Sequence, residues 1–167
     1  MDREDQFESR LSRARAAVNE ARGSDKKVLA DALRALGNIE RRPEHLREDA
    51  NRSYAEAAAI YRELNQPLDE AWVMRHMGIN HEYAERLDEA EAAYEKSLEL
   101  YRHHSKNDDL DYANAVRYVA VIKMRLGKRD ESEVLWREAV ERYERCGITE
   151  GVAEGMRHLE QLARDRT

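Results

Sequence analysis

Short segments of the sequence recur at an almost constant interval. The segment LRALGN (33–38) is followed by MRHMGI (74–79), VRYVAV (116–121) and the more divergent MRHLEQ (156–161), at spacings of 41, 42 and 40 residues. A second series of small and aromatic residues runs half a period out of step: Ala50, Tyr54 and Ala57, then Ala90, Tyr94 and Ser97, then Ser132, Trp136 and Ala139. Two helical signatures that alternate at a fixed period predict a stacked array of helices.

The composition agrees with a helical array. Charged residues make up 38% of the chain and apolar residues 41%, with only 7 Gly and 2 Pro, which is typical of long, exposed helices. So polar a chain would be disordered if it had a high net charge and no apolar period. Here 29 basic and 35 acidic residues nearly cancel to a net charge of −6, and the period is clear. We therefore expect the 167 residues to form one all-α domain.

The same composition argues against several functional classes. A net charge of −6 lacks the basic footprint that general nucleic-acid binding requires. No apolar run approaches the length of a membrane span, and the segment MDREDQFESR is charged where a signal peptide would be apolar. The single Cys146 cannot form an internal disulfide, which suits a reducing compartment. We expect a cytoplasmic protein that binds neither nucleic acid nor membrane.

Turn signals divide the chain into about eight helices. We expect the first over Asp2–Arg22, ended by Gly23, and the third from Pro43, which suits a first helical turn, to Leu64. The expected domain is made of a degenerate half-repeat, three full repeats and a capping helix, at residues 1–23, 25–65, 67–106, 108–146 and 149–165. Each unit leaves an apolar face that only its neighbour covers, so stability is a sum over neighbouring contacts.

Small residues at the repeat period predict close contact between the two helices of a pair. Gly78 leaves a notch on the first helix of its unit, and Ala90 presents a small side chain on the second, so that the axes approach closely. Tyr94 then fills the space towards the following repeat. We expect three aromatic residues that occupy the same place in successive units to lie in the core: Tyr54, Tyr94 and Trp136.

Two stretches carry the clearest family signature: MGINHEYAERLDEAEAAYEKSLELYR (77–102) and RLGKRDESEVLWREAVERY (125–143). They resemble the tetratricopeptide repeat, and the resemblance extends over about residues 28–165. The period exceeds the family's usual ~34 residues, so the chain is similar to the longer-helix variety found in kinesin light chains and in sensor arrays of bacterial regulators. The resemblance implies a right-handed α-solenoid of antiparallel helix pairs whose first helices line a concave face. The chain departs from the family where a tyrosine is usual, at Glu40, His81 and Lys123.

No catalytic or metal-binding motif is present in the sequence. His81-Glu82 begins like a zinc protease motif, but Glu85 stands where the second histidine would be. His103 and His104 are adjacent and therefore point in different directions on a helix. There is no phosphate-binding glycine loop, no serine elbow and no cysteine with a local base. We expect a protein that is not an enzyme and needs no cofactor or metal.

One arginine recurs at the same place in four successive units: Arg34, Arg75, Arg117 and Arg157. Stacked repeats turn this equivalence into a spatial column along the concave face. The neighbours of these arginines are amide and aromatic residues: Asn38, Trp72, His76, Asn114 and Tyr118. A cationic column of this kind suits carboxylates, either the acidic side chains of a peptide or its terminus. We expect these residues to form a peptide-binding groove.

The alternative is that the arginine column is neutralised within the protein, by acids on the same or adjacent helices: Asp31, Glu70, Asp111 and Glu154. Arg34 and Asn38, one helical turn apart, resemble the pair that holds a terminal carboxylate in chaperone-binding members of the family. The later units depart from that pattern, at His76, Asn114 and Tyr118.

The sequence thus favours a protein-interaction module whose concave groove receives a peptide or a helix of a partner protein, which would carry acidic residues if the arginine column binds it. The alternative function is a sensor or regulatory component of a bacterial signalling or transcription-control system that acts with another chain. The sequence also leaves a homodimer open.

Overall fold

The computed structural model describes residues 3–106 and 109–164, and within those two ranges the chain is helical and contains no strand. The helices are, in chain order, α1 (Arg3–Ala21), α2 (Lys26–Glu40), the short 3-10 helix η1 (Glu44–Leu46), α3 (Arg47–Glu63), α4 (Pro67–Tyr83), α5 (Leu87–His104), α6 (Leu110–Arg125), α7 (Arg129–Cys146) and α8 (Thr149–Arg164). Three expected boundaries lie outside the described residues: the start of the first helix at Asp2, the start of the third full repeat at 108 and the end of the capping helix at 165.

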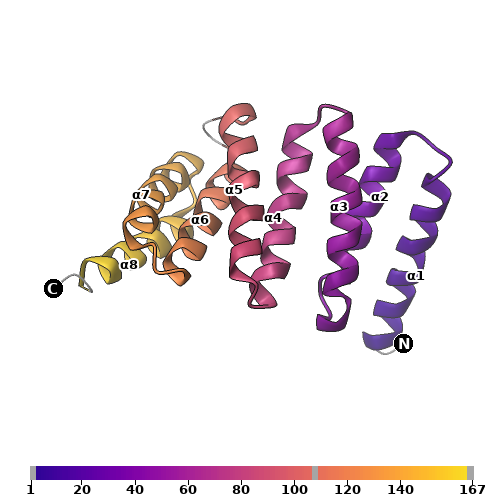
Figure 1. Ribbon diagram of the computed structural model, residues 1–167, viewed down its shortest axis with the longest axis horizontal. Coiled ribbons are helices and arrows are strands. Elements are labelled where there is room, and N and C mark those ends of the chain that lie inside the picture. Colours follow the sequence, from indigo (N-terminus) through magenta and orange to yellow (C-terminus); the bar gives the residue numbers. More distant parts are fainter. Residues whose placement is uncertain (1–2, 107–108, 165–167) are drawn as a thin grey trace.

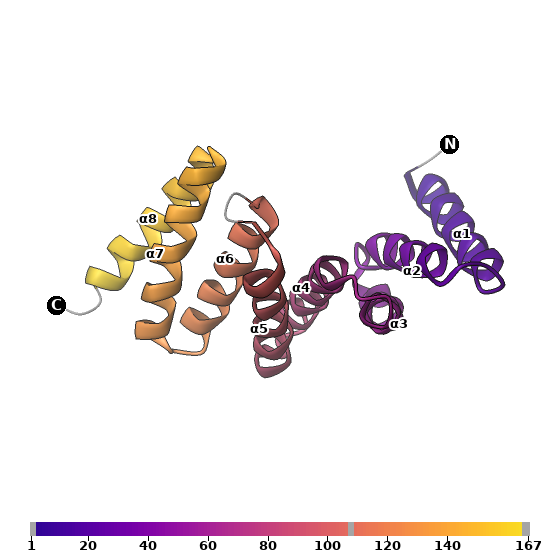
Figure 2. The same ribbon diagram turned by 90° about the horizontal axis from the view of Figure 1, so that it is seen from above.

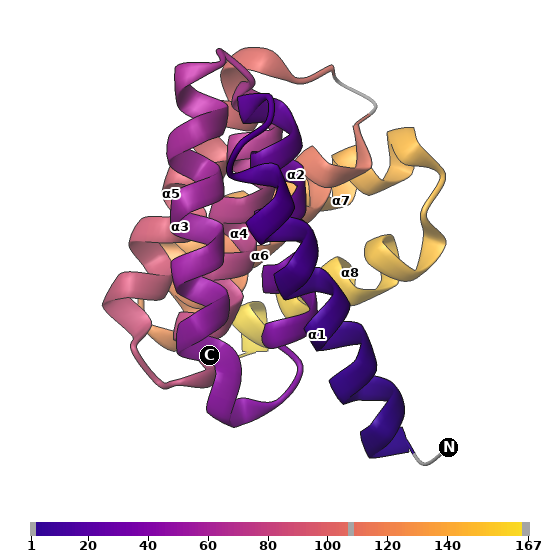
Figure 3. The same ribbon diagram turned by 90° about the vertical axis from the view of Figure 1, so that its right-hand side faces the viewer.

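The helices stand side by side in chain order, each antiparallel to the next, with α1 and α8 at opposite ends of the row (Figure 1). Seen from above, the row bends and twists (Figure 2). Seen along the row, α7 and α8 are strongly inclined to α2 and α3 (Figure 3). Each helix contacts the next one in the chain, and α4 also contacts α6. This arrangement confirms the all-α solenoid that the repeat period predicted.

The helices fall into two sets, which we name by their order within a pair. The first helices are α2, α4, α6 and α8, and the second helices are α3, α5 and α7, while α1 takes the place of a second helix before α2. The first-helix face is the side of the solenoid on which the first helices are exposed.

Local chemistry sets the ends of the helices. Asp25 caps α2 and Asp109 caps α6, because each side chain accepts a hydrogen bond from the backbone N–H two residues further on, at 2.7 and 2.8 Å. Pro67 is the first residue of α4, where its missing N–H costs no hydrogen bond within the helix. Gly147 follows α7 in the left-handed conformation, with φ 71°, which glycine adopts without steric penalty.

The third helix begins later than the sequence predicted. We expected it to start at Pro43, but Pro43 is extended, with ψ 139°, and α3 begins at Arg47. The single turn η1 fills the gap, closed by the hydrogen bond that the Leu46 N–H donates to the Pro43 carbonyl at 3.2 Å. The prediction was wrong because the fixed φ of proline suits an extended residue ahead of a helix as well as the first helical turn.

Glycines on the first helices leave room for aromatic rings of the second helices. A Cβ atom added at Gly37 would lie 2.6 Å from the Tyr54 ring, and one added at Gly78 would lie 2.5 Å from the Tyr94 ring. Both tyrosines are buried, as expected. Ala90 is buried too, but the atoms nearest to the notch at Gly78 belong to Tyr94. These two repeats therefore require glycine at this place, because a side chain would occupy the volume of the tyrosine ring, whereas the third repeat has Ala120 there and Trp136 as its ring.

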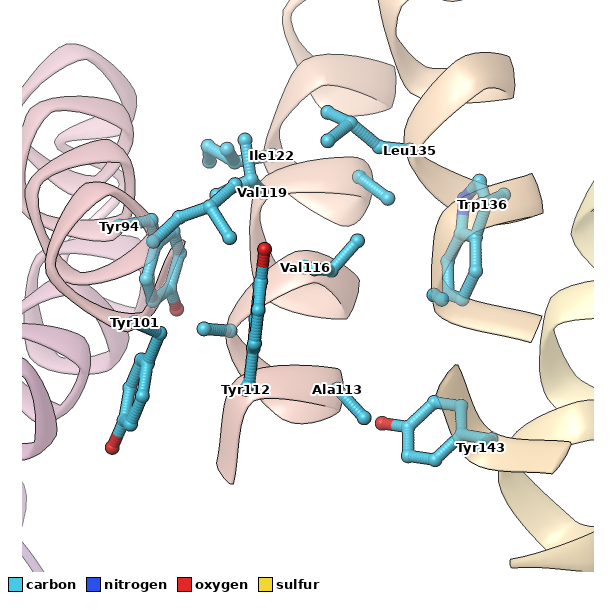
Figure 4. Close-up of a cluster of buried hydrophobic side chains, with 14 of the residues drawn as sticks. Tyr94, Tyr101, Tyr112, Ala113, Val116, Val119, Ile122, Leu135, Trp136 and Tyr143 are labelled. Carbon is cyan, nitrogen blue, oxygen red and sulfur yellow. The ribbon is translucent and has the colours of Figure 1, made fainter. Parts of the chain in front are cut away.

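The apolar core is shared between neighbouring helices. One cluster of buried side chains belongs to α1–α4 and a second to α4–α8; Figure 4 shows the second, with Tyr94, Val116 and Trp136 between successive helices. The last described helix packs in the same way, since a Cβ atom added at Gly151 of α8 would lie 2.5 Å from the Tyr143 ring of α7. Each helix is thus covered by its neighbours, which is the pattern of a solenoid.

Charged side chains are buried at two of the positions where a tyrosine is usual. Glu40 is 3% exposed and accepts a hydrogen bond from Ser53 Oγ at 2.8 Å. The Lys123 ammonium is held by three carboxylates, Glu91 at 2.7 Å, Glu95 at 2.6 Å and Glu131 at 2.9 Å. Burial works against the charge of this lysine, but the carboxylates raise the pKa of Lys123 above its ordinary value. Both side chains are accommodated in the interior because their polar groups have partners there.

Candidate functional site

Three of the four arginines in the expected groove are bound to acids of the protein. Each pair joins an arginine of one first helix to an acid of the next: Arg34–Asp69 at 2.7 Å, Arg75–Asp111 at 2.6 Å and Arg117–Glu154 at 3.1 Å. The pairs connect α2 to α4, α4 to α6 and α6 to α8. The arginine column is therefore also a series of contacts between successive repeats.

The pairing follows the alternative that the sequence left open, with a different partner for the first arginine. Arg34 pairs with Asp69, whereas Asp31 and Glu70 were the acids expected nearby. Glu70 is 3% exposed and instead pairs with Arg62 of the second helix α3 at 2.6 Å. Asp69 and Glu70 are adjacent and point in different directions on α4, so only one of them faces Arg34.

The arginines differ in burial, which limits what each can bind. The Arg75 side chain is 6% exposed, against 34% for Arg34 and 24% for Arg117. Burial alone would lower the pKa of Arg117, but Glu154 raises it above its ordinary value, so this arginine stays charged. Arg157 is exposed and forms no ion pair with any described residue, because no first helix follows α8 in that part of the chain.

The rings expected in the groove pack on the second helix of the preceding repeat. His76, Tyr118 and His158 occupy equivalent places, with ring centroids at these distances: His76–Tyr54 6.0 Å, Tyr118–Tyr94 5.1 Å and His158–Trp136 4.3 Å. His76 also stacks on Trp72 at 3.7 Å, and its Nδ1–H donates to the Trp72 carbonyl at 2.9 Å. Burial lowers the pKa of His76 to about 3, so its ring is neutral at pH 7. These rings contribute to the contacts between repeats.

The amide groups of the expected groove are also engaged inside the protein. Their carbonyl oxygens accept hydrogen bonds from tyrosine hydroxyls: Asn38 from Tyr54 at 3.0 Å and Asn114 from Tyr143 at 2.8 Å. In the middle repeat Trp72 stands where the third repeat has Asn114, and Tyr101 stands where it has Tyr143. Trp72 offers no oxygen to the Tyr101 hydroxyl, and both residues line a cleft on the first-helix face.

Among the described residues, clefts lie on the first-helix face between α4 and α6 and between α2 and α4. The α4/α6 cleft has a volume of about 490 Å³ and is lined by Ile79, Glu82, Tyr83, Glu85, Arg117, Tyr118, Val121 and Arg125. The α2/α4 cleft has a volume of about 410 Å³ and is lined by Arg34, Asn38, Leu68, Asp69, Trp72, Tyr101, Asp109 and Asp111. Both volumes are within the range of about 300–1,000 Å³ that is usual for small-ligand sites.

The charged side chains of the α4/α6 cleft are paired with one another or with neighbouring residues, so a ligand would contact mainly the apolar side chains of its walls. Arg125 reaches Glu82 at 3.1 Å and Glu85 at 2.6 Å. Glu82 also accepts a hydrogen bond from the Tyr94 hydroxyl at 2.7 Å. Tyr83 is 65% exposed at the rim of the cleft. An aliphatic or aromatic side chain could enter this cleft without breaking an ion pair.

The α2/α4 cleft has a different character, because acids outnumber bases in its lining. It contains Asp69, Asp109 and Asp111 but a single arginine, Arg34, whose guanidinium lies 5.2 Å from the Trp72 ring centroid. This part of the face is therefore not a carboxylate site.

The structure separates the expected groove residues into two groups. Five of them line the clefts: Arg34, Asn38, Trp72, Arg117 and Tyr118. The other four lie elsewhere: Arg75, His76 and Asn114 within contacts between helices, and Arg157 in a cleft on α8. The sequence reasoning missed Ile79 and Val121, which stand one turn after the arginine of their repeats, at the place of Asn38.

The described residues show neither a metal site nor a membrane span. No three of their His, Cys, Asp and Glu side chains are arranged to hold a metal ion. No helix in the described ranges is both long and apolar enough to cross a membrane.

The comparisons with known proteins find tetratricopeptide repeats in the sequence, and TPR-like repeats among the solved structures of similar fold. The family model of the tetratricopeptide repeat matches residues 71–111 and 113–145. The crystal structure of BtubC (BKLC) from P. vanneervenii superposes with a TM-score of 0.72 at 14% identity, over 98% of this chain and 75% of that chain. No protein of curated function matches the chain in sequence.

Two further crystal structures come from Podosopora anserina and are those of a kinesin light chain with nearly identical TPR-like repeats. One has a TM-score of 0.61 at 10% identity and covers 100% of this chain and 99% of that chain. A variant of it has a TM-score of 0.62 at 10% identity and covers 100% of both chains. Identities this low show a shared fold. The family model thus identifies tetratricopeptide repeats at residues 71–111 and 113–145, and the solved structures show the same solenoid fold along the chain.

Proposed function

We propose that the protein binds a peptide or a helix of a partner protein along the first-helix face, with the α4/α6 cleft at the centre of the site. Tetratricopeptide repeats in general mediate contacts between proteins. The observation that carries the proposal is the α4/α6 cleft, where the exposed Tyr83 and the side chains of Ile79, Tyr118 and Val121 surround about 490 Å³. Aromatic side chains that combine an apolar body with a polar tip are typical anchors of protein interfaces.

The proposed contact residues are those that line the clefts of this face: Arg34, Asn38, Trp72, Ile79, Tyr83, Arg117, Tyr118 and Val121. In this proposal Arg75, His76 and Asn114 hold the first helices in place. Arg157, exposed and without an ion pair to a described residue, would bind a carboxylate of the ligand at the α8 end. The ligand would thus carry an aliphatic or aromatic side chain for the α4/α6 cleft, and an acidic group only towards α8.

A selection from a displayed library of random peptides tests this proposal and does not require the partner to be identified. We expect enriched peptides to share an aliphatic or aromatic residue, and to lose about tenfold or more in affinity, or about 1.4 kcal/mol, for the Tyr83→Ser variant. Tyr83 is exposed, so this change should leave the fold intact. Val28→Ser is the control, because Val28 is also exposed, at 52%, but lines neither cleft of the first-helix face. The α4/α6 cleft would be excluded if no enriched peptide bound Tyr83→Ser more weakly than the parent.

A further inference from the structure

A third cleft lies on the opposite side of the solenoid, between the second helices α5 and α7. Its volume is about 540 Å³, larger than either cleft of the first-helix face, and it is lined by Glu95, Leu98, Glu99, Arg102, His103, Val119, Lys123, Glu131, Val134 and Leu135. The lining residues belong to α5, α6 and α7, with α6 beneath the two second helices. We call it the α5/α7 cleft.

The floor of this cleft is apolar and its rim carries an exposed aliphatic side chain. Leu98, Val119 and Leu135 form the floor and are 2%, 2% and 8% exposed, so they are fixed in the core. Val134 on α7 is 67% exposed beside them. The exposed valine and the apolar floor together offer an aliphatic partner side chain a place away from water.

Carboxylates surround this apolar floor. Glu95, Glu99 and Glu131 line the cleft, and the side chains of Glu95 and Glu131 are 51% and 58% exposed. Lys123 lies between those two carboxylates and also binds Glu91, so a single ammonium is shared by three acids. Glu99 is bound to Lys96 at 2.9 Å, and Arg102, which also lines the cleft, is bound to Glu138 at 2.9 Å. The three rim carboxylates are each more than half exposed, so their outer oxygen atoms remain available to further cations.

The preceding pair of second helices shows that the fold does not need these side chains. In the repeat alignment, the groove between α3 and α5 has alanine where the α5/α7 cleft has glutamate or valine: Ala55 for Glu95, Ala59 for Glu99 and Ala92 for Val134. Both grooves join the same kind of helices in the same solenoid. Glu95, Glu99 and the exposed valine are therefore particular to this cleft, whereas Glu131 has a counterpart in the preceding groove, Glu89.

We propose that the α5/α7 cleft binds a segment of a partner protein in which an aliphatic side chain is flanked by lysine or arginine. The aliphatic side chain lies on Leu98, Val119 and Leu135 against Val134, and the flanking cations meet the carboxylates of Glu95, Glu99 and Glu131. The cleft is on the other side of the molecule from the α4/α6 cleft, so the protein holds two different segments at once. The chemistry of the two sites differs, since only the α5/α7 cleft selects for basic residues.

The same peptide selection tests this proposal with variants of the second site. We expect a second group of enriched peptides, with an aliphatic residue and lysine or arginine within one helical turn of it. Fluorescence anisotropy should show that their affinity falls about tenfold or more for Val134→Asp, and similarly for the double variant Glu99→Gln/Glu131→Gln. Tyr83→Ser should not change it, which separates this site from the proposed groove. Binding should weaken with added salt, because the charges are partly exposed.

A double variant of equal charge provides the control. Glu141→Gln/Glu144→Gln removes two exposed carboxylates of α7 that do not line the cleft, and we expect the affinity to stay within about twofold of the parent. If the control lost as much peptide affinity as Glu99→Gln/Glu131→Gln, the effect would come from the net charge of the protein, and the proposal would be overturned. So would enrichment of no basic peptide, or unchanged binding to Val134→Asp. Self-association of the parent that Val134→Asp abolishes would overturn it too, because the occupant would then be a second copy of this chain.

Discussion

Replacement of Gly78 by alanine should destabilise the protein although alanine is the better helix former. The added Cβ would lie 2.5 Å from Cδ1 and Cε1 of Tyr94, closer than side-chain carbons approach in proteins. Tyr94 cannot easily withdraw, because it is 1% exposed, its hydroxyl is bound to Glu82 at 2.7 Å and its ring stacks on Tyr118 at 5.1 Å. The clash must therefore be relieved by a shift of the helices.

The magnitude follows from two opposing terms. Overpacking of a buried site costs about 1–3 kcal/mol, and the fixed ring places Gly78 near the upper end of that range. The higher helix propensity of alanine returns about 1 kcal/mol. We expect a net loss of about 2 kcal/mol in the free energy of unfolding. In a Tyr94→Ala background the ring is absent, so that Gly78→Ala should be neutral or stabilise the protein by up to about 1 kcal/mol.

Urea denaturation of the four proteins of this double-mutant cycle, followed by far-UV circular dichroism, measures both terms. The expected coupling energy between the two positions is about 2–3 kcal/mol. A Gly78→Ala variant as stable as the parent, or one that loses the same free energy in both backgrounds, would refute the idea that the Tyr94 ring requires the glycine.

Three further predictions concern the arginine column, the buried histidine and the last helix. Arg75→Glu should lower the free energy of unfolding by about 3 kcal/mol, because it removes a buried cation and places a second negative charge beside Asp111. The exposed Arg157→Glu should change it by less than about 0.5 kcal/mol. Equal shifts of the two variants in thermal unfolding would contradict the pairing of Arg75 with Asp111. His76 titrates near pH 3 in the folded protein and near its ordinary pKa of about 6.5 in the unfolded chain. Between these values only the unfolded chain binds the proton, so the free energy of unfolding decreases as the pH is lowered. Lowering the pH from 7 to 5 should reduce the free energy of unfolding of the parent by about 2 kcal/mol more than that of His76→Phe, as measured by urea titrations. If the free energies of the two proteins changed equally with pH, the histidine would not be buried in its neutral form. Truncation after Ile148 should uncover Trp136 and Tyr143 and produce oligomers in size-exclusion chromatography with light scattering, and a monomer of unchanged stability would show that α8 does not cap the array.

The repeat period was enough to predict the helices and the core positions. Tyr54, Tyr94 and Trp136 are all buried, because residues one period apart meet the same neighbours in a solenoid. The start of the third helix was not predictable from Pro43, since an extended proline and a helical one share the same φ. Periodicity identifies equivalent positions, but it does not decide among neighbouring conformations of a turn.

The candidate site was harder to predict than the fold. The period placed four arginines in equivalent positions, but it did not reveal which acid faces each one. Asp69 and Glu70 are adjacent, and only the rotation of α4 about its axis turns Asp69 to Arg34 and Glu70 to Arg62. The positions of the clefts likewise depend on how several helices pack against one another, and no single residue of the sequence indicates this.

The ion pairs of the arginine column also give the array a direction. Each arginine belongs to one repeat and its acid to the next, so every repeat between the ends carries one acceptor for the unit before it and one donor for the unit after it. A duplicated copy of residues 67–108 would bring its own Asp69 and its own Arg75, and the series of pairs would close again around the insertion. An array built on this rule can lengthen by whole units without any new contact having to arise at the joints.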